Sequence, residues 1–374
     1  MSLNKCSPSD DPRYIVPQTG YEWPDNNREY WPTDGWLTAE AENHGFDRVK
    51  LDQARDFASN DDLARALLVI KDGYLVSEDY YDEGSIDAST NLWSVTKSYA
   101  SAITGLIWDD NLIDSTDQLM KDLMPHYPEF EQITLQHVLT HTTGLSWNEE
   151  GPLWVQWILS DDWVTEALAR EHLYEPGTHW KYSSGNTHFL SALVTHRSGL
   201  TPGQLAKTRL FDPMGIEFMV QDPPLTYSNW PEYIEILPQS WHQDPQGNET
   251  ASFGLFQTAR DMAKFGYLYL NRGRWENQQL ISEDWVKIST KDHETNIYGR
   301  YSYGYQWYLT FVDDKPAFLA SGFGGQIIGV VPSLDLVVVL KYEAETPEHP
   351  VSGTAHDDMG LFELVVKAVI VPGS

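Results

Sequence analysis

Segments with strand character lie near both ends of the chain, and a long stretch of helical character separates them. Arg65–Ile70 and Tyr74–Tyr80 are apolar runs joined by Lys71-Asp72-Gly73, a sequence typical of a tight β-hairpin turn. Four more strands are predicted near the C-terminus: Tyr303–Phe311, Ala317–Ser321, Gln326–Val331 and Leu336–Tyr342. The pattern predicts an α+β fold, an α/β sandwich in which one antiparallel sheet is built from both termini, helices flank it, and a mostly helical sub-domain is inserted.

The same patterns divide the chain into three parts. Residues 1–38 are rich in Pro, Asp, Asn and Trp without periodicity, and we expect them to form an extended arm. Residues 39–109 and 246–374 together are predicted to form the sheet-containing sub-domain, and residues 110–245 the helical sub-domain, because Pro and Gly break the latter into short helical pieces. A cleft between the two sub-domains is the expected place for an active site.

The charge balance excludes some classes of partner. The 374 residues include 25 Lys and Arg against 55 Asp and Glu, a formal net charge of −30, and no segment supplies the basic stripe that nucleic acids require. No apolar stretch approaches the roughly 20 residues of a membrane-spanning helix. The lone cysteine, Cys6, precedes Ser-Pro-Ser-Asp-Asp, which fits either a lipid-anchored first residue or an inert cysteine; we favour an extracytoplasmic, periplasmic or lipid-anchored location over a cytoplasmic one.

Ser94 and Lys97 stand at the start of the clearest helical pattern, Ser94–Asp109. Three residues apart, their side chains differ by about 60° around the helix axis, so hydroxyl and amine can touch. The backbone N–H groups of a helix N-terminus also favour a developing negative charge. A neutral Lys97 amine could act as a base, or its ammonium form could lower the pKa of a neighbouring base.

Tyr182 lies just before a second helical pattern, His188–Val194, where its phenol can face a cleft. To act as a base at neutral pH it needs a pKa below its usual value of about 10, and a nearby Lys97 ammonium has the right sign to lower it. Tyr227 lies in a similar Tyr-Ser sequence, but Trp230-Pro231 follows it and we interpret that segment as a loop.

A glycine-rich segment, Ala320–Gly325, closes one predicted strand and opens the next. Glycine allows the backbone to approach a ligand closely, so an N–H group here could complete an oxyanion hole with the N–H of Ser94. Taken alone, the segment is equally typical of an ordinary hairpin.

Together these motifs resemble those of the serine β-lactamase and penicillin-binding-protein superfamily. The similarity covers roughly residues 63–342 and is greatest to class C β-lactamase-like esterases and 6-aminohexanoate-dimer hydrolases. The motifs that carry it are, in order, Ser94-Val95-Thr96-Lys97, Leu139-Thr140-His141-Thr142-Thr143-Gly144-Leu145, Tyr182-Ser183-Ser184 and Ser321-Gly322-Phe323-Gly324-Gly325.

The resemblance implies a β-lactamase/transpeptidase-like fold and a set of roles. It gives Ser94 the role of nucleophile, Lys97 that of proton-transfer partner and Tyr182 that of general base or acid. It also implies that the backbone N–H groups of Ser94 and Phe323 are the oxyanion donors. Four further residues are expected to contact substrate: Ser184, Ser321, Gly322 and Gly324.

Two departures from the family pattern bear on substrate choice. The Lys-Thr-Gly of β-lactamases is Ala320-Ser321-Gly322 here, so the cation that binds a β-lactam carboxylate is missing, and the usual Asn two places after the tyrosine is Ser184. These losses favour an esterase or amidase that acts on small neutral or amine-bearing substrates.

The sequence therefore predicts a serine hydrolase that needs no cofactor or metal and forms an acyl-enzyme on Ser94. The alternatives are a D-amino-acid peptidase or weak β-lactamase on the same fold, and a catalytically silent protein that senses peptides or peptidoglycan fragments. His137 and His141 have the i, i+4 spacing of zinc ligands, but no Glu follows His137 and a helix end before Gly144 explains the segment. No distinguishable carboxylate pair supports a glycosidase.

Overall fold

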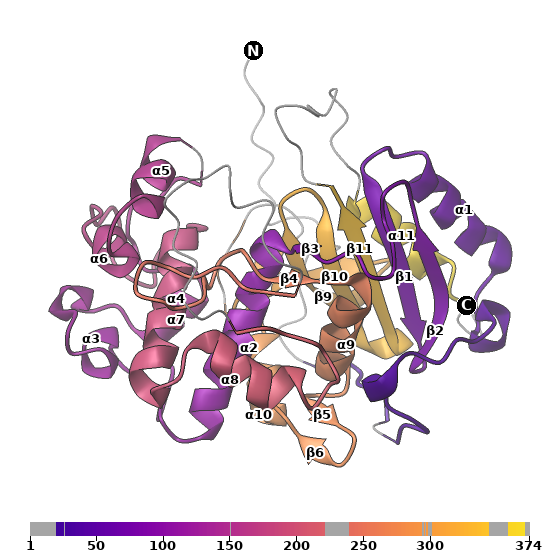
Figure 1. The fold of residues 1–374 in the computed structure, drawn as a ribbon, viewed down its shortest axis with the longest axis horizontal. Helices are drawn as coiled ribbons and strands as arrows, with labels where there is room; N and C mark the ends of the chain where they lie inside the picture. The colour runs from indigo at the N-terminus through magenta and orange to yellow at the C-terminus, as the bar shows by residue number, and fades with distance from the viewer. Residues whose placement is uncertain are drawn as a thin grey trace.

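A seven-stranded antiparallel sheet forms the centre of the molecule, with strand order β2-β1-β11-β10-β9-β8-β7 (Figure 1). The computed structural model describes residues 20–25, 27–149, 151–220, 239–293, 295, 297, 301–343 and 358–370. The sheet strands are β1 Ala64–Lys71, β2 Tyr74–Tyr80, β7 Ser302–Tyr303, β8 Tyr308–Val312, β9 Lys315–Gly322, β10 Gln326–Val331 and β11 Leu336–Tyr342; short pairs are formed by β3 Thr90–Asn91 with β4 Phe256–Gln257 and by β5 Arg274–Trp275 with β6 Gln278–Gln279.

The N-terminal hairpin and the C-terminal strands meet through β1 and β11, as the sequence predicts. Val69 lies opposite Val338 in this antiparallel pair. The hairpin turn has positive φ angles at Asp72 (54°) and Gly73 (89°), the backbone that a two-residue turn between twisted strands requires. The prediction of one antiparallel sheet assembled from both ends of the chain is confirmed.

Helices cover both faces of this sheet, and the described helices are α1 Arg48–Ser59, α2 Thr96–Asp109, α3 Met120–Leu123, α4 Leu135–Leu139, α5 Pro152–Ile158, α6 Trp163–Leu168, α7 Ser184–Ser198, α8 Pro202–Ala206, α9 Ala259–Leu270, α10 Glu283–Ser289 and α11 Asp358–Lys367. In Figure 1, α1 and α11 lie on one side of the sheet, while α2 and α9 lie on the other.

Two apolar cores result, one on each face. Alternate side chains of β1 divide between them, with Leu68 and Ile70 packing toward the α2 and α9 side and Leu67 and Val69 toward α1 and α11. Burial on both faces explains why β1 is a continuous apolar run without polar alternation. No described helix has the length and apolar character needed to cross a bilayer.

The strand predicted over Tyr303–Phe311 is wrong in one respect, because it is interrupted. The chain turns between β7 and β8, where the Gly304 N–H donates to the Trp307 carbonyl at 2.9 Å and Gln306 has a φ of 63°. The Gln306 side chain donates to the carbonyls of Val138 and Leu139 instead, which ties this turn to α4.

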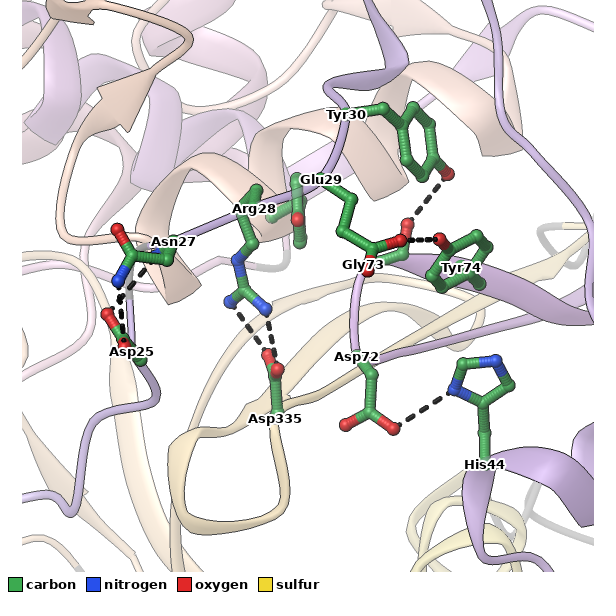
Figure 2. A pocket seen from close by; sticks show the side chains of 11 residues that line it. Asp25, Asn27, Arg28, Glu29, Tyr30, His44, Asp72, Gly73, Tyr74 and Asp335 are labelled. Carbon is green, nitrogen blue, oxygen red and sulfur yellow. Dashed lines mark hydrogen bonds and ion pairs between the residues drawn. The ribbon is translucent and has the colours of Figure 1, made fainter.

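Residues 20–25 and 27–38 lie against the β1–β2 and β10–β11 turns, where several of their side chains line a cavity of about 490 Å³. Figure 2 shows the Arg28 guanidinium donating to both Asp335 oxygens, at 2.6 and 2.8 Å, and the His44 ring 3.0 Å from Asp72. Charged and polar side chains of this cavity pair across it, and the Arg28–Asp335 pair fastens the segment to the turn between β10 and β11. Cys6 and the rest of residues 1–19 lie outside the described residues.

Candidate active site

Ser94 lies in a 3₁₀ turn, Trp93–Val95, that leads directly into α2. The preceding Trp93 has a φ of 49°, an unusual conformation for a bulky side chain. Its N–H donates to Asn91 Oδ1 at 2.9 Å and its ring packs edge-on against Phe323, which hold this conformation in place. The bend leaves Ser94 half-buried at the start of the helix while the residues that follow are buried.

Lys97 is brought to Ser94 by the first turn of α2, as the three-residue spacing predicts. Its side chain is 1% exposed, and its Nζ lies 3.0 Å from Ser94 Oγ, from Ser184 Oγ and from the Ser252 carbonyl oxygen. Burial disfavours the charged form and lowers the pKa of Lys97 to about 8, although the nearby Glu149 carboxylate acts in the opposite direction. A substantial fraction of neutral amine is therefore present near neutral pH.

Tyr182 joins this pair from the segment that precedes α7, where Ser183 caps the helix by accepting from the Asn186 N–H at 3.1 Å. Lys97 Nζ lies 4.7 Å from the centre of the Tyr182 ring. The lowered pKa that a base at neutral pH would need is not found here. Burial raises the pKa of Tyr182 well above its usual value, Tyr308 and Glu149 add to the rise, and a hydrogen bond with Ser94 opposes it only in part. Tyr182 is a neutral phenol, suited to donating a proton.

The glycine-rich segment is a hairpin turn between β9 and β10 that lies against Ser94. A side chain at Gly322 would collide with the Leu92 carbonyl and come within 3.2 Å of the Ser94 nitrogen, so only glycine lets the strand end approach the nucleophile this closely. Gly324 has a φ of 76°, Ser321 is half-buried in β9, and the Phe323 ring is 57% exposed. The glycine-rich segment Ala320–Gly325 thus borders the same site as Ser94, Lys97 and Tyr182.

Glu149 is a member of the site that the sequence did not identify. One of its oxygens accepts from the Ser184 N–H at 2.6 Å and from the Trp147 indole N–H at 2.7 Å, and the other accepts from the Ser184 hydroxyl at 2.7 Å. The sequence around Glu149 does not distinguish it from the other acidic residues among the 55 in the chain. The Ser252 carbonyl is a backbone group and equally invisible in a sequence motif.

The two histidines of the i, i+4 pair occupy separate structural positions. His137 Nδ1 accepts from the Thr134 N–H at 3.2 Å at the start of α4, and His141 Nδ1 accepts from the Ser183 N–H at 3.3 Å. Burial and the nearby Lys97 charge lower the pKa of His141 well below its usual value. Within the described ranges, no group of three or more His, Cys, Asp or Glu side chains is arranged to hold a metal ion.

Tyr227, the alternative tyrosine of the sequence, lies outside the described residues. The choice of Tyr182 over Tyr227 therefore rests on the placement of Tyr182 beside Ser94 and Lys97.

The model of the Beta-lactamase family matches residues 63–357. The chain belongs to this family. Its members are serine hydrolases, so the protein is an enzyme of that general kind. The match begins at β1 and includes all of the motifs that carry the resemblance.

Relatives within the family differ in their names. The 6-aminohexanoate-dimer hydrolase of Paenarthrobacter ureafaciens is 23% identical over 299 residues, which cover 73% of this chain and 71% of that protein. Among solved structures, a penicillin-binding-protein homologue from Caulobacter crescentus has a TM-score of 0.64 at 18% identity, covering 87% of this chain and 99% of its own. A family VIII carboxylesterase has a TM-score of 0.63 at 17% identity, covering 87% and 98%. At these identities the structures show a shared fold.

Proposed function

We propose that the protein is an esterase or amidase that forms an acyl-enzyme on Ser94 with small, uncharged or amine-bearing substrates. The observation that carries the proposal is the 3.0 Å contact between Ser94 Oγ and a Lys97 amine whose pKa is lowered to about 8. A hydroxyl at a helix start, next to a buried amine that is partly neutral, is the arrangement of an activated nucleophile. The names of the hydrolase and carboxylesterase relatives support the same class of reaction.

In the proposed reaction, Lys97 takes the Ser94 proton as Ser94 Oγ attacks the substrate carbonyl carbon. The negative charge that develops on the carbonyl oxygen is stabilised by the backbone N–H groups of Ser94 and Phe323. The Tyr182 phenol donates the proton that the leaving group needs, and Lys97 returns its proton to the phenolate. Water then hydrolyses the acyl-enzyme by the reverse sequence of proton transfers.

A serine-directed fluorophosphonate tests the nucleophile. We expect intact-mass analysis to show one added group, and peptide mapping to place it on Ser94, with no label on a folded Ser94→Ala variant. Labelling of a different serine would refute this mechanism. Absence of labelling on well-folded protein would instead favour the alternative of a silent sensor of peptides or peptidoglycan fragments.

Substrate choice can be tested because Ala320 stands where β-lactamases have a lysine. A β-lactam carries a carboxylate beside its scissile amide, and to bury that anion without a paired cation costs several kcal/mol. Ala320 supplies no cation, and the net charge of −30 repels anions further. We therefore expect measurable hydrolysis of p-nitrophenyl acetate or butyrate, and a kcat/KM for nitrocefin well below that of a class C β-lactamase assayed alongside. Efficient nitrocefin turnover would favour the weak β-lactamase or D-amino-acid peptidase alternative.

A further inference from the structure

We propose that Glu149 is a positioning residue for the reaction: through the Ser184 hydroxyl, it turns the lone pair of the Lys97 amine toward Ser94. This inference rests on the proposed function and adds a residue and a proton arrangement to it. Three hydrogen-bonded groups form the chain, namely the Glu149 carboxylate, the Ser184 hydroxyl and the Lys97 amine.

The direction of the first bond is fixed by the carboxylate. An ionised carboxylate can only accept hydrogen bonds, so the Ser184 hydroxyl must be the donor to Glu149 Oε2. The other oxygen, Oε1, accepts from the Ser184 and Trp147 N–H groups. The one hydroxyl proton of Ser184 therefore points to Glu149, 2.7 Å away. Its oxygen is left to accept from Lys97 Nζ at 3.0 Å.

The amine then has no freedom in how it uses its own hydrogens. The Ser252 carbonyl, at 3.0 Å, can only accept, so one N–H of Lys97 points to it and a second points to Ser184. A neutral amine has two N–H bonds and one lone pair. The lone pair therefore faces the third neighbour, Ser94 Oγ, also at 3.0 Å.

This orientation is the one that lets the proton move. As Ser94 Oγ bonds to the substrate carbonyl carbon, its O–H bond breaks, the proton forms a third N–H bond on Lys97, and the carbonyl π electrons move to the oxyanion. If Glu149 did not hold the Ser184 proton, that hydroxyl could rotate and donate to the Lys97 lone pair, in competition with Ser94. The carboxylate thus acts on the nucleophile through a chain of three hydrogen bonds.

The groups that face Lys97 come from several elements. Glu149 precedes α5 and raises the pKa of Lys97; Tyr182 precedes α7, and His141 follows α4. Tyr303 on β7 and Tyr308 on β8 surround Tyr182, and both are phenols whose pKa values burial raises. Of these groups, Glu149 is the one whose charge acts directly to raise the pKa of the amine. In the wild type we expect kcat/KM to rise with pH and level off above about pH 8, because the neutral amine is the reactive form.

The test is the pH profile of p-nitrophenyl butyrate hydrolysis by Glu149→Gln. An amide can donate to Ser184 Oγ and turn its proton toward Lys97, so we expect the plateau to fall by about 10-fold or more. Loss of the carboxylate also removes a charge that raises the Lys97 pKa, so the acid limb should move to lower pH. Loss of the charge alone would move that limb without lowering the plateau, so the fall of the plateau is the measure of the orientation effect. Glu175→Gln, at an exposed glutamate, is the matched control and should change neither quantity.

A double-mutant cycle isolates the orientation effect. Ser184→Asn places an amide oxygen beside Lys97, and that oxygen accepts without help from Glu149. The loss of rate caused by Glu149→Gln should then shrink to about 2- to 3-fold, while the shift of the acid limb persists. Equal losses in the two backgrounds would overturn the proposal.

Ser184→Ala provides a second approach if Glu149→Gln unfolds. It breaks the same link from the other side and keeps two donors on Glu149, so a folded Ser184→Ala with wild-type kinetics would also overturn the proposal. Fluorophosphonate labelling distinguishes a failure of the Glu149 inference from a failure of the proposed function. If the wild type labels on Ser94 but Glu149→Gln behaves as Glu175→Gln does, this inference fails and the proposed function stands; if Ser94 does not label, the proposed function fails first.

Discussion

Lys97 and Lys341 are two buried lysines in different parts of the molecule, and their surroundings differ in one decisive way. Lys97 lies on α2 with a side chain 1% exposed, and Lys341 lies on β11 and is 3% exposed. Burial lowers the pKa of the first to about 8 and of the second to about 7. By pKa alone, either amine could be a base.

The partners of the two amines distinguish them. Lys341 Nζ donates to the carbonyls of Ala88 and Gln257, at 3.3 and 2.6 Å, and neither oxygen has a proton to give. Lys97 touches two hydroxyls as well as one carbonyl. A lowered lysine pKa therefore reports burial, and the neighbouring hydroxyl is what makes the amine useful for chemistry.

The largest expected effect comes from replacing each lysine by methionine. Lys97→Met should lower kcat/KM for p-nitrophenyl butyrate by about 10³-fold, within the range of a lost acid–base group, because Lys97 takes the Ser94 proton in the proposed mechanism. Lys341→Met should stay within about 3-fold of the wild type, since it removes two hydrogen bonds to carbonyl oxygens and none to a hydroxyl, a loss that affects stability and not turnover. Comparable losses in the two variants, at similar melting temperatures, would break the distinction.

The comparison extends to two tyrosines, Tyr182 at the site and Tyr305 in the core. Tyr182→Phe should lower kcat/KM by about 10²-fold or more, because it removes the proton donor to the leaving group. Tyr305→Phe removes a hydroxyl bonded to Thr116 and Gln136, at 3.0 and 3.2 Å, and should cost stability with little change in kcat/KM. Steady-state kinetics and thermal melts of both variants measure the change in kcat/KM and the change in stability separately. A loss of kcat/KM in Tyr305→Phe as large as that in Tyr182→Phe would contradict a specific catalytic role for Tyr182.

The last prediction concerns stability and its pH dependence, with no effect on turnover expected. The folded pKa of Lys341, about 7, lies below the unfolded value of about 10.4, so between these pH values the unfolded chain binds more protons than the folded one. The free energy of unfolding of the wild type should therefore rise relative to that of Lys341→Met as the pH increases from 7 toward 10. Urea unfolding at several pH values measures the difference. A constant difference would mean that Lys341 keeps its charge when buried.

Much of this arrangement can be predicted from the sequence, because local spacing determines it. The hairpin, the C-terminal strands and the approach of Lys97 to Ser94 follow from strand patterns and helix periodicity. The direction of the Tyr182 pKa shift could not be predicted, because it depends first on burial and then on the electrostatic effects of Tyr308 and Glu149, which are distant in the chain. Glu149 was missed for the same reason. Its partner is 35 residues away, and no local pattern distinguishes it from the other acids.

The ion pair between Arg28 and Asp335 joins residues 307 positions apart, and β1 likewise finds its partner β11 only near the end of the chain. During synthesis at about 5–20 residues per second, the first strand therefore waits roughly 15–60 s before its neighbour leaves the ribosome. During that interval the apolar strand β1 has an unpaired edge, and such an edge can pair with another chain and cause aggregation. We therefore expect the β1–β2 hairpin to need shelter from other chains until β11 has been synthesised.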